Sequence, residues 1–304
     1  MMRILWQCDF DELTMAREAP WRWRGITRIN SVILPATVAL LMSAPVAMAA
    51  AVAAPTMASV ATPALAKPKA ARPASASPRV KRILAMLYRR GKTLQNFSAA
   101  VRVTVNHLRS GETDINIGRI WYQRAKTGRT RFDIHFSILA VDGAIARHHA
   151  DHDIIFDGRW LIDRNGSAKI YRKIEIAPPG ARFNPLKLGQ GPIPIPIGQR
   201  PQTVEREFQI VPVKVKHQRP HTVAIKLKPR DPKAFTFDSL TFVISTRLQL
   251  PVLIRRIDPD GTPTTAVFSK IVINKPMHHS FHVSPPPSDA GWTVTIKHMK
   301  RSAH

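Results

Sequence analysis

The sequence predicts a mainly β (α+β) fold, in which a curved antiparallel sheet is covered on one face by an N-terminal amphipathic helix and a proline-rich segment. Two observations predict the sheet. Apolar and polar residues alternate over roughly ten short segments beyond Ala99, and Asp-Gly or Asn-Gly pairs join several of them. A third observation predicts the cover: residues 77–91 and 183–207 depart from this period, and the apolar face of such a sheet must be buried.

The chain is strongly basic. Its 304 residues include 46 Lys and Arg against 20 Asp and Glu, a formal net charge of +26. Such a balance indicates an anionic partner, such as nucleic acid, membrane headgroups or an acidic polymer, and a plain basic solvated surface is the alternative. The one cysteine, Cys8, cannot form an internal disulfide.

The N-terminal region is typical of a secretory signal peptide, assigned to residues 1–49. Arg22, Arg24 and Arg28 precede an apolar core over residues 32–42, and Ala47-Met48-Ala49 has the form of a cleavage site. The first twenty residues carry four acidic side chains, so the working signal is expected to begin later.

Three consequences follow from that signal. Pro35 and the shortness of the apolar core disfavour a permanent membrane span. No cysteine follows the core, which disfavours a lipid anchor, and the expected compartment is the periplasm. An exported protein does not usually meet nucleic acid, so the positive charge points to phospholipid headgroups or other envelope anions.

Residues 50–78, rich in Ala, Pro and Ser, are predicted to be a disordered tether. At its end Ser77 is a helix N-cap, Pro78 occupies the first helical position, and Gly91 is the expected stop. Val80, Ile83, Leu84 and Leu87 then fall at i, i+3, i+4 and i+7, the spacing of one apolar helix face.

The strand-like segments put apolar side chains on one face of the sheet and polar, often cationic, side chains on the other. Asp157-Gly158, Asn165-Gly166 and Asp260-Gly261 mark turns between them. Val294 and Ile296 belong to the last strand of the predicted antiparallel meander.

Residues 183–199, FNPLKLGQGPIPIPIGQ, alternate apolar residues with proline. Proline cannot donate to a β-ladder, so the segment is not a central strand. A solvated linker would not carry Leu186, Leu188, Ile193, Ile195 and Ile197. We expect these side chains to cover the apolar face of the sheet or to edge its mouth. A core-packing loop with no role in ligand binding is the alternative.

Several motifs, in order over most of residues 80–295, resemble the LolA-type outer-membrane lipoprotein carriers and the wider LolA-like superfamily. They are LQNFSAAVRVTV, GRIWYQR, IIFDGRWLIDRN, REFQIV with VAIKLKPRD, IRRIDPDGTPTTAVFSKIVIN and FHVSPPPSDAGWTV. The resemblance implies an unclosed β-barrel with a helical lid over an apolar cavity that receives acyl chains, without catalysis or cofactor.

The resemblance also implies that Arg124 holds the lid shut by bonding to lid backbone. Ala125 stands where the family usually has proline, and Arg129 and Arg131 lie nearby. The expected lid is proline-rich, with only Pro201 to about Phe208 helical, a departure from the family's longer central helix. The predicted cavity and lid residues are Arg124, Ile120, Tyr122, Phe132, Ile134, Phe136, Leu186, Leu188, Ile193, Ile195, Ile197, Val223, Ile225, Leu240, Phe242 and Ile244.

Two groups of histidines are candidate metal ligands. The run RHHADHD, from Arg147 to Asp153, combines His with carboxylates but is interpreted as a solvated loop. His278, His279 and His282 form a second group, which is also interpreted as solvated. No phosphate-binding loop, nucleophile elbow or helical zinc motif is present, so an enzyme is not expected.

The predicted function is a periplasmic lipid or lipoprotein carrier or binding protein, which shields acyl chains during transfer towards the outer membrane. Residues 79–298 form the predicted LolA-like lipid-binding domain and 299–304 a basic tail. Expected partners are an acylated lipoprotein or a phospholipid-like ligand, and an anionic membrane surface or inner- or outer-membrane proteins, with the protein a monomer. A non-transporting periplasmic sensor or protein-interaction module on the same fold is the main alternative, and a binder of anionic polymers is another.

Overall fold

The computed structural model describes residues 76–125, 128–142, 144–146, 150–180, 183–188, 194–215, 219–287 and 290–299. The predicted signal peptide, almost all of the predicted tether and most of the basic tail lie outside the described residues. Within the described part of the chain, no helix has both the length and the apolarity needed to cross a membrane.

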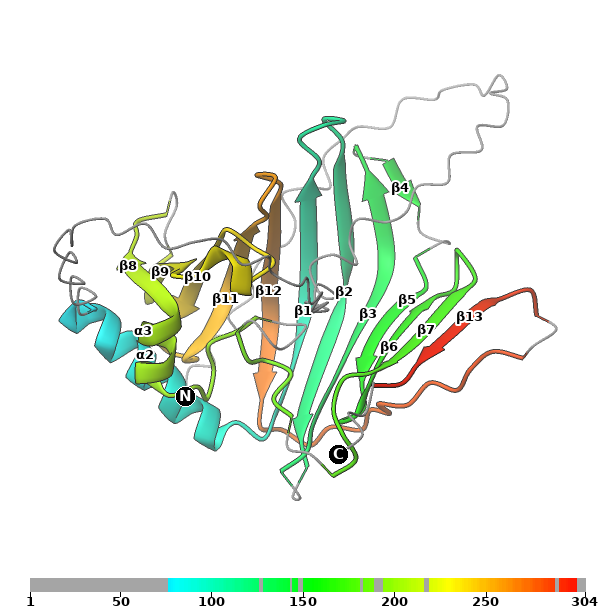
Figure 1. Ribbon diagram of the computed structural model, residues 1–304, viewed down its shortest axis with the longest axis horizontal. Coiled ribbons are helices and arrows are strands. Elements are labelled where there is room, and N and C mark those ends of the chain that lie inside the picture. The colour runs from blue at the N-terminus through cyan, green and yellow to red at the C-terminus, as the bar shows by residue number, and fades with distance from the viewer. Residues whose placement is uncertain are drawn as a thin grey trace, which may run out of the picture. The chain divides into compact units, whose positions relative to one another are not determined.

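Within the described residues, one mixed sheet of 13 strands dominates the fold (Figure 1). The strands are β1 (Asn96–Asn106), β2 (Thr113–Arg124), β3 (Thr130–Val141), β4 (Ala144–Ala146), β5 (His152–Phe156), β6 (Trp160–Asn165), β7 (Ile170–Glu175), β8 (Phe208–Pro212), β9 (Thr222–Pro229), β10 (Ser239–Ser245), β11 (Leu250–Ile257), β12 (Pro263–Ile273) and β13 (Thr293–Lys297). Their spatial order is β13-β7-β6-β5-β3-β2-β1-β12-β11-β10-β9-β8, and β4 pairs with β3 alone.

The sheet is not closed, because β13 and β8 lie at its two ends and do not pair with each other. The predicted mainly β fold with an unclosed sheet is therefore confirmed. The prediction that β13 continues an antiparallel meander was wrong, since β13 runs parallel to β7. The chain between β7 and β13 includes β8 to β12, and the residues after β12 carry it back to the β7 edge.

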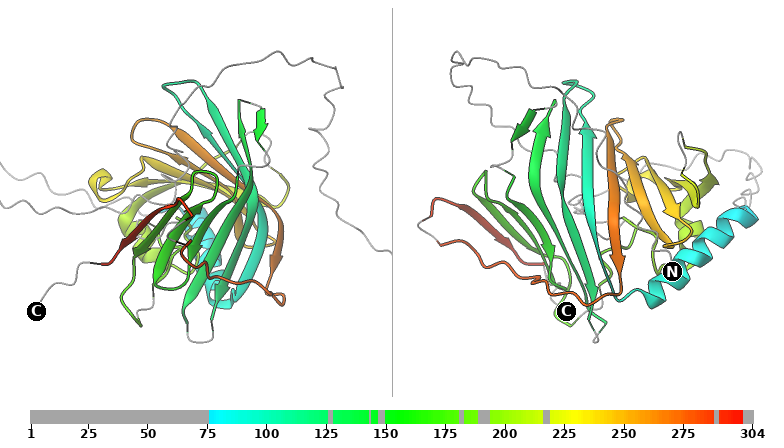
Figure 2. Two further views of the ribbon diagram at one scale, coloured as in Figure 1. Left: turned by 90° about the vertical axis from the view of Figure 1, so that its right-hand side faces the viewer. Right: turned by 180° about the vertical axis from the view of Figure 1, so that it is seen from behind.

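The helices lie towards the β8 end of the sheet (Figures 1 and 2). Helix α2 (Pro78–Thr93) begins at Ser77, whose hydroxyl accepts a hydrogen bond from the Val80 amide, as predicted. Helix α3 (Pro201–Glu207) is followed directly by β8, and η3 (Pro232–Ala234) is a single 3₁₀ turn between β9 and β10. The expected stop at Gly91 was wrong, because α2 continues to Thr93 with Gly91 buried in its last turn.

The main hydrophobic core lies between α2, the proline-rich segment and the inner face of the sheet. Alternation fixes which side chains point inward. On β2 the inward side chains include Ile120 and Tyr122, and on β3 they include Phe132, Ile134 and Phe136. The register of β2 on β3 shifts between Ile117 and Gly118, and a Cβ at Gly118 would overlap the His135 carbonyl, so glycine is required at this bulge.

The outer face of the sheet carries a second, smaller core, which the sequence pattern does not predict. Phe281 packs on Ile155, Ile162 and Tyr171, with Trp121, Trp160, Met277, Val283 and Trp292 around them. We call residues 274–287 and 290–292 the C-terminal strap; it connects β12 to β13 (Figure 2). The expectation that the outer face is uniformly polar was therefore wrong.

Candidate functional site

Three elements cover the inner face of the sheet and are called the lid: α2, the described parts of residues 183–199, and α3. The apolar stripe of α2 is buried as its spacing predicts, with Val80 and Leu87 fully inaccessible to solvent. The proline-rich segment contributes Leu186, Leu188 and Ile197, and all of these side chains join the core of the sheet. The lid and the sheet thus share one continuous hydrophobic interior.

The proline-rich segment makes local hydrogen bonds with its backbone groups instead of joining the sheet. The Ile195 amide donates to the Leu186 carbonyl at 3.1 Å and the Ile197 amide to the Ile195 carbonyl at 2.8 Å. The buried side chain of Gln199 donates through Nε2 to the Ile195 carbonyl at 3.1 Å. Local hydrogen bonds and proline, which has no amide to satisfy, let an extended backbone lie against apolar side chains without ladder bonds.

The proline-rich segment touches α2 through two glycines. A Cβ at Gly91 would overlap the backbone of Gly198, which has a positive φ of 72°. The Gly198 amide donates to the Leu87 carbonyl at 3.3 Å, which adds a polar contact between the two parts of the lid. The absence of a side chain at Gly91 is thus what lets helix and segment come into backbone contact.

Arg124, at the end of β2, bonds to the lid at the same place. Its Nη2 donates to the Gly91 carbonyl oxygen at 2.6 Å. Its own amide donates to the Gln95 carbonyl at 2.7 Å, which holds the end of β2 near the end of α2. Burial raises the pKa of the neighbouring Tyr122 phenol, and Arg124 opposes that rise. The charge-assisted bond therefore joins the sheet to the lid helix beside a buried, neutral phenol.

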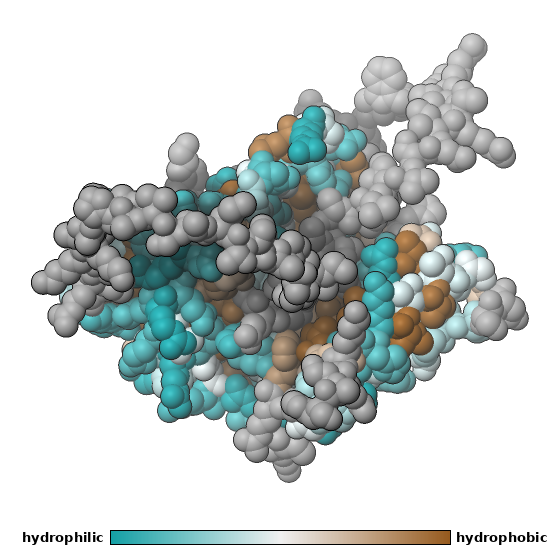
Figure 3. Space-filling model, viewed as in Figure 1, coloured by the Kyte–Doolittle hydropathy of each residue, from teal (hydrophilic) through white to brown (hydrophobic). Residues whose placement is uncertain are grey.

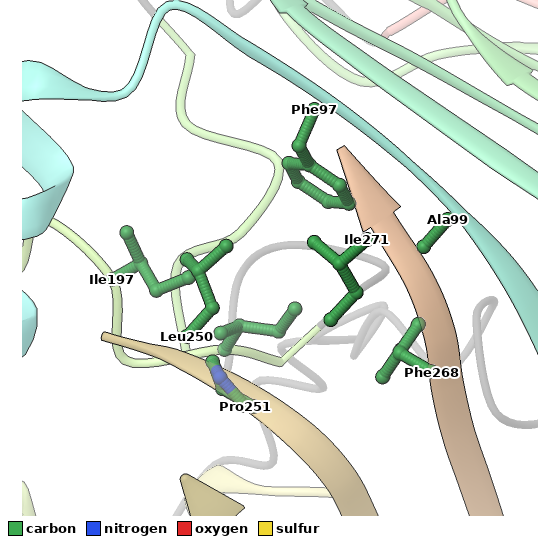
Figure 4. A pocket seen from close by; sticks show the side chains of 8 residues that line it. Phe97, Ala99, Ile197, Leu250, Pro251, Phe268 and Ile271 are labelled. Atoms are coloured by element: carbon green, nitrogen blue, oxygen red, sulfur yellow. The ribbon is translucent and has the colours of Figure 1, made fainter. Parts of the chain in front are cut away.

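A small apolar pocket remains between lid and sheet (Figure 4). Side chains from β1, β11, β12 and the proline-rich segment converge on it. Its lining is Phe97, Ala99, Ile195, Ile197, Leu250, Pro251, Phe268 and Ile271. The free volume is about 20 Å³, which is room for about one water molecule. The described side chains around this pocket are tightly packed core residues, so the lid is closed over it in this structure.

The described residues predicted for the cavity and lid lie together in this interior, apart from Arg124, which lies at its polar edge. Val223 is only partly buried and packs against the core, and Ile193 lies outside the described residues. Ile195 and Ile197 line the pocket, whereas the following are packed core side chains: Ile120, Tyr122, Phe132, Ile134, Phe136, Leu186, Leu188, Ile225, Leu240, Phe242 and Ile244. Phe97, Leu250 and Phe268 were missed, although their alternation in β1, β11 and β12 could have indicated them.

Apolar and polar surfaces are separated on this side of the molecule (Figure 3). Apolar surface shows in the middle of the view, while the outward side of α2 is hydrophilic. That side of α2 carries only positive charges: Arg79, Lys81, Arg82, Arg89 and Lys92 are exposed, and the helix has no acidic residue. The lid thus presents an apolar face to the sheet and a cationic face to solvent.

Two histidines expected to be solvated are held by carboxylates, His152 on the inner face of the sheet beside Phe136 and His279 on the outer face. His152 is 6 % exposed and bonds Asp163 at 2.7 Å from within β5. His279 of the strap stacks on Trp121, with ring centroids 4.0 Å apart, and bonds Asp133 at 2.6 Å. The interpretation of both histidines as solvated was wrong. The alternation of side chains along β5 places His152 on the buried inner face of the sheet, and the strap places His279 against Trp121.

Asp151 and Asp153, which flank His152 in the sequence, bind the side chain of Arg164. Ligand atoms of His135, Asp151 and Asp153 lie within 4.8 Å of one another. Arg164 Nη1 donates to Asp151 and to Asp153 at 2.8 Å each, and His135 bonds Asp153 at 2.7 Å. The guanidinium thus supplies the positive charge that this group of carboxylates requires.

The pH dependence of stability tests the contact between strap and sheet. Burial raises the pKa of the Asp133 carboxyl from 3.8 to about 6, against the opposing effects of His279 and His135 and with a smaller rise from Asp153. Because the folded pKa is the higher one, the stability that Asp133 contributes is complete below pH 3.8 and is lost as the pH rises through about 6. Asp133→Asn should therefore gain about 2–3 kcal/mol relative to the wild type between pH 3.5 and 7, measured by urea unfolding.

The exposed turn residue Glu112 supplies the control, and Glu112→Gln should follow the wild type at every pH. A stability difference between Asp133→Asn and the wild type that does not change with pH would contradict the raised pKa.

No protein-family model matches the chain, and no curated protein matches it. Among solved structures it is similar to MucB in the Pseudomonas aeruginosa MucA/MucB complex, at 13% identity and a TM-score of 0.38, over 66% of this chain and 59% of that one. It is also similar to the Mycobacterium tuberculosis lipoprotein LppX, at 10% identity and a TM-score of 0.37, over 67% and 99% of the two chains. A putative outer membrane lipoprotein-sorting protein domain from Vibrio parahaemolyticus matches at 10% identity and a TM-score of 0.30, over 66% and 95%.

These neighbours have LolA-like folds. One of them is named as a lipoprotein-sorting domain, the kind of protein that the sequence motifs resemble. The chain spans about three fifths of the length of the MucB chains that it matches, at 59% and 64%. At TM-scores of 0.40 and below, these likenesses carry no information about ligand or partner.

Proposed function

We propose that this protein is a periplasmic carrier or binding protein for acylated ligands, without catalytic activity, and that the interior between lid and sheet is where acyl chains are shielded. The observation that carries the proposal is the continuous apolar interior between an unclosed sheet and a lid that lies outside the sheet. Acyl chains would gain roughly 0.8 kcal/mol for each methylene buried there.

In this proposal the lid must move before a ligand enters, since the pocket holds only about 20 Å³. A few polar contacts oppose that movement. Arg124 bonds the Gly91 carbonyl, and Asn274 Nδ2 donates to the Thr93 carbonyl at 2.9 Å. Thr130 Oγ1 donates to the Phe183 carbonyl at 2.9 Å, and Arg230 donates to the Glu205 and Glu207 carbonyls of α3, while the core of this interface is apolar. A ligand can replace apolar contacts with its own methylenes, so opening at this end of α2 has to break the Arg124 bond, a charge-assisted contact to the end of that helix.

The expected ligand is a lipoprotein acyl group or a phospholipid-like molecule, shielded during transfer towards the outer membrane. The exposed basic side chains of α2 favour approach to an anionic membrane surface. The filled interior favours one alternative, a non-transporting sensor or protein-interaction module on the same fold.

Mass spectrometry of the protein purified from its native envelope tests the proposal. Lipid or acyl-peptide adducts that survive native conditions and are released on denaturation are the expected result. Protein without adducts that also fails to bind a fluorescent fatty acid would overturn it. A stoichiometric protein partner retained by such lipid-free protein would favour the sensor or interaction module.

A further inference from the structure

A second hollow lies outside the closed interior, between the first half of α2 and the ends of β9 and β10. We call it the Arg79–Arg82 groove. Its volume is about 490 Å³, and its lining is Arg79, Arg82, Ile83, Met86, Val223 and Thr246. That volume falls in the range of small-molecule sites, about 300–1,000 Å³. The groove therefore offers a ligand space that the closed interior does not.

The floor of the groove is apolar, and the backbone groups along it already take part in helix, sheet or turn hydrogen bonds. Ile83 and Met86 lie on α2, where backbone groups bond within the helix. Val223 pairs with Ile244 inside the sheet. The Thr246 amide and hydroxyl both donate to the His221 carbonyl, at 2.8 and 3.0 Å. A peptide backbone would find few partners here, whereas a hydrocarbon chain needs none.

The rim of the groove is cationic. Arg79 and Arg82 are exposed and stand three residues apart, so they are neighbours on the helix surface. Among the described residues, neither guanidinium has a hydrogen-bond or ion-pair partner, and no acidic residue lines the groove. Each guanidinium is carried on an aliphatic stem, and both side chains line the groove, which suits an anion attached to an apolar chain.

We propose that the Arg79–Arg82 groove binds the anionic headgroup and first methylenes of a lipid-like amphiphile, of the alkyl phosphate class, before its chain enters the interior. The inference rests on the proposed function and adds a headgroup site to it. Ile83 belongs both to this floor and to the main core, so the groove borders the closed interior. Met86, unbranched and half-buried, is the side chain best able to move aside.

The test compares three probes by isothermal titration below their micelle concentrations: dodecyl phosphate, dodecyl maltoside and inorganic phosphate. Arg79→Gln/Arg82→Gln should weaken dodecyl phosphate binding about 10- to 100-fold and leave dodecyl maltoside unchanged. Lys81→Gln/Arg89→Gln removes the same charge from the same helix outside the groove and should change dodecyl phosphate binding less than about threefold. Met86→Gln should weaken both detergents.

Equal losses in the two double variants would show diffuse attraction to the basic helix and overturn the proposal. So would wild-type affinity for inorganic phosphate that matches dodecyl phosphate, or no binding of dodecyl phosphate. Different results would refute the groove and the proposed carrier function. If envelope lipids co-purify with Arg79→Gln/Arg82→Gln as they do with the wild type, the groove is refuted and the carrier stands. If only the groove binds the probe and no lipid co-purifies, the carrier is refuted and the groove stands.

Discussion

Replacing Gly91 by alanine is expected to lower the melting temperature by about 6–12 °C, from roughly 3 kcal/mol of overpacking. Helix propensity alone predicts the opposite sign, because alanine at an interior helical position is about 1 kcal/mol better than glycine. Gly91 lies within α2, but a Cβ there would overlap the backbone of Gly198, which cannot move aside as a flexible side chain could. Packing between helix and segment should therefore outweigh propensity.

Differential scanning calorimetry measures this change, and binding of an apolar dye reports whether the lid has separated from the sheet. Gly111→Ala is the matched control. Gly111 has a φ of 77° but nothing within 4 Å of an added Cβ, so it should lose only about 1 kcal/mol through backbone strain. A melting temperature of Gly91→Ala at or above that of the wild type would show that the two glycines are not in contact.

Replacing Arg124 by methionine is expected to favour the open lid by about 10- to 100-fold, since a charge-assisted hydrogen bond contributes about 1.5–3 kcal/mol. Methionine keeps much of the unbranched side chain but cannot donate to the Gly91 carbonyl. Amides of α2 should exchange with solvent faster by a similar factor. A fluorescent fatty acid should bind faster, because the competent state is more populated.

Arg129→Met controls for the loss of a positive charge near the same strand end. Arg129 is exposed, and its side chain has no hydrogen bond to another described residue. In Arg129→Met the α2 amides should exchange with solvent, and the fluorescent fatty acid should bind, at the wild-type rates. Unchanged α2 exchange in Arg124→Met would remove Arg124 from the lid mechanism, and equal effects of both variants would assign the change to net charge.

The sequence predicted the elements whose burial follows a simple period. The stripe Val80, Ile83, Leu84 and Leu87 defines the buried face of α2 because helical spacing places these side chains together. Alternation likewise predicted inward residues such as Phe132 and Phe242. The proline-rich segment was predicted to lie on the sheet from the conflict between its apolar side chains and its missing amide donors.

Contacts between distant segments could not be predicted in the same way. Gly91 resembled a helix stop, whereas its contact with Gly198 shows that glycine is there for close packing. His279 resembled a solvated residue until the strap placed it on Trp121. The parallel pairing of β13 with β7 has no local signal, because register between distant strands depends on the whole connection. The small size of the pocket depends on the packing of every side chain around it.

Photolabelling with a diazirine-bearing fatty acid tests the central claim most directly, because it marks the residues that an acyl chain touches. After irradiation and digestion, mass spectrometry should find the label on the pocket lining, at Phe97, Ile197, Leu250 and Phe268, more strongly in Arg124→Met than in the wild type. Label confined to exposed aliphatic residues of the sheet, such as Val211 and Val267, or no label in either protein, would contradict an acyl-binding interior.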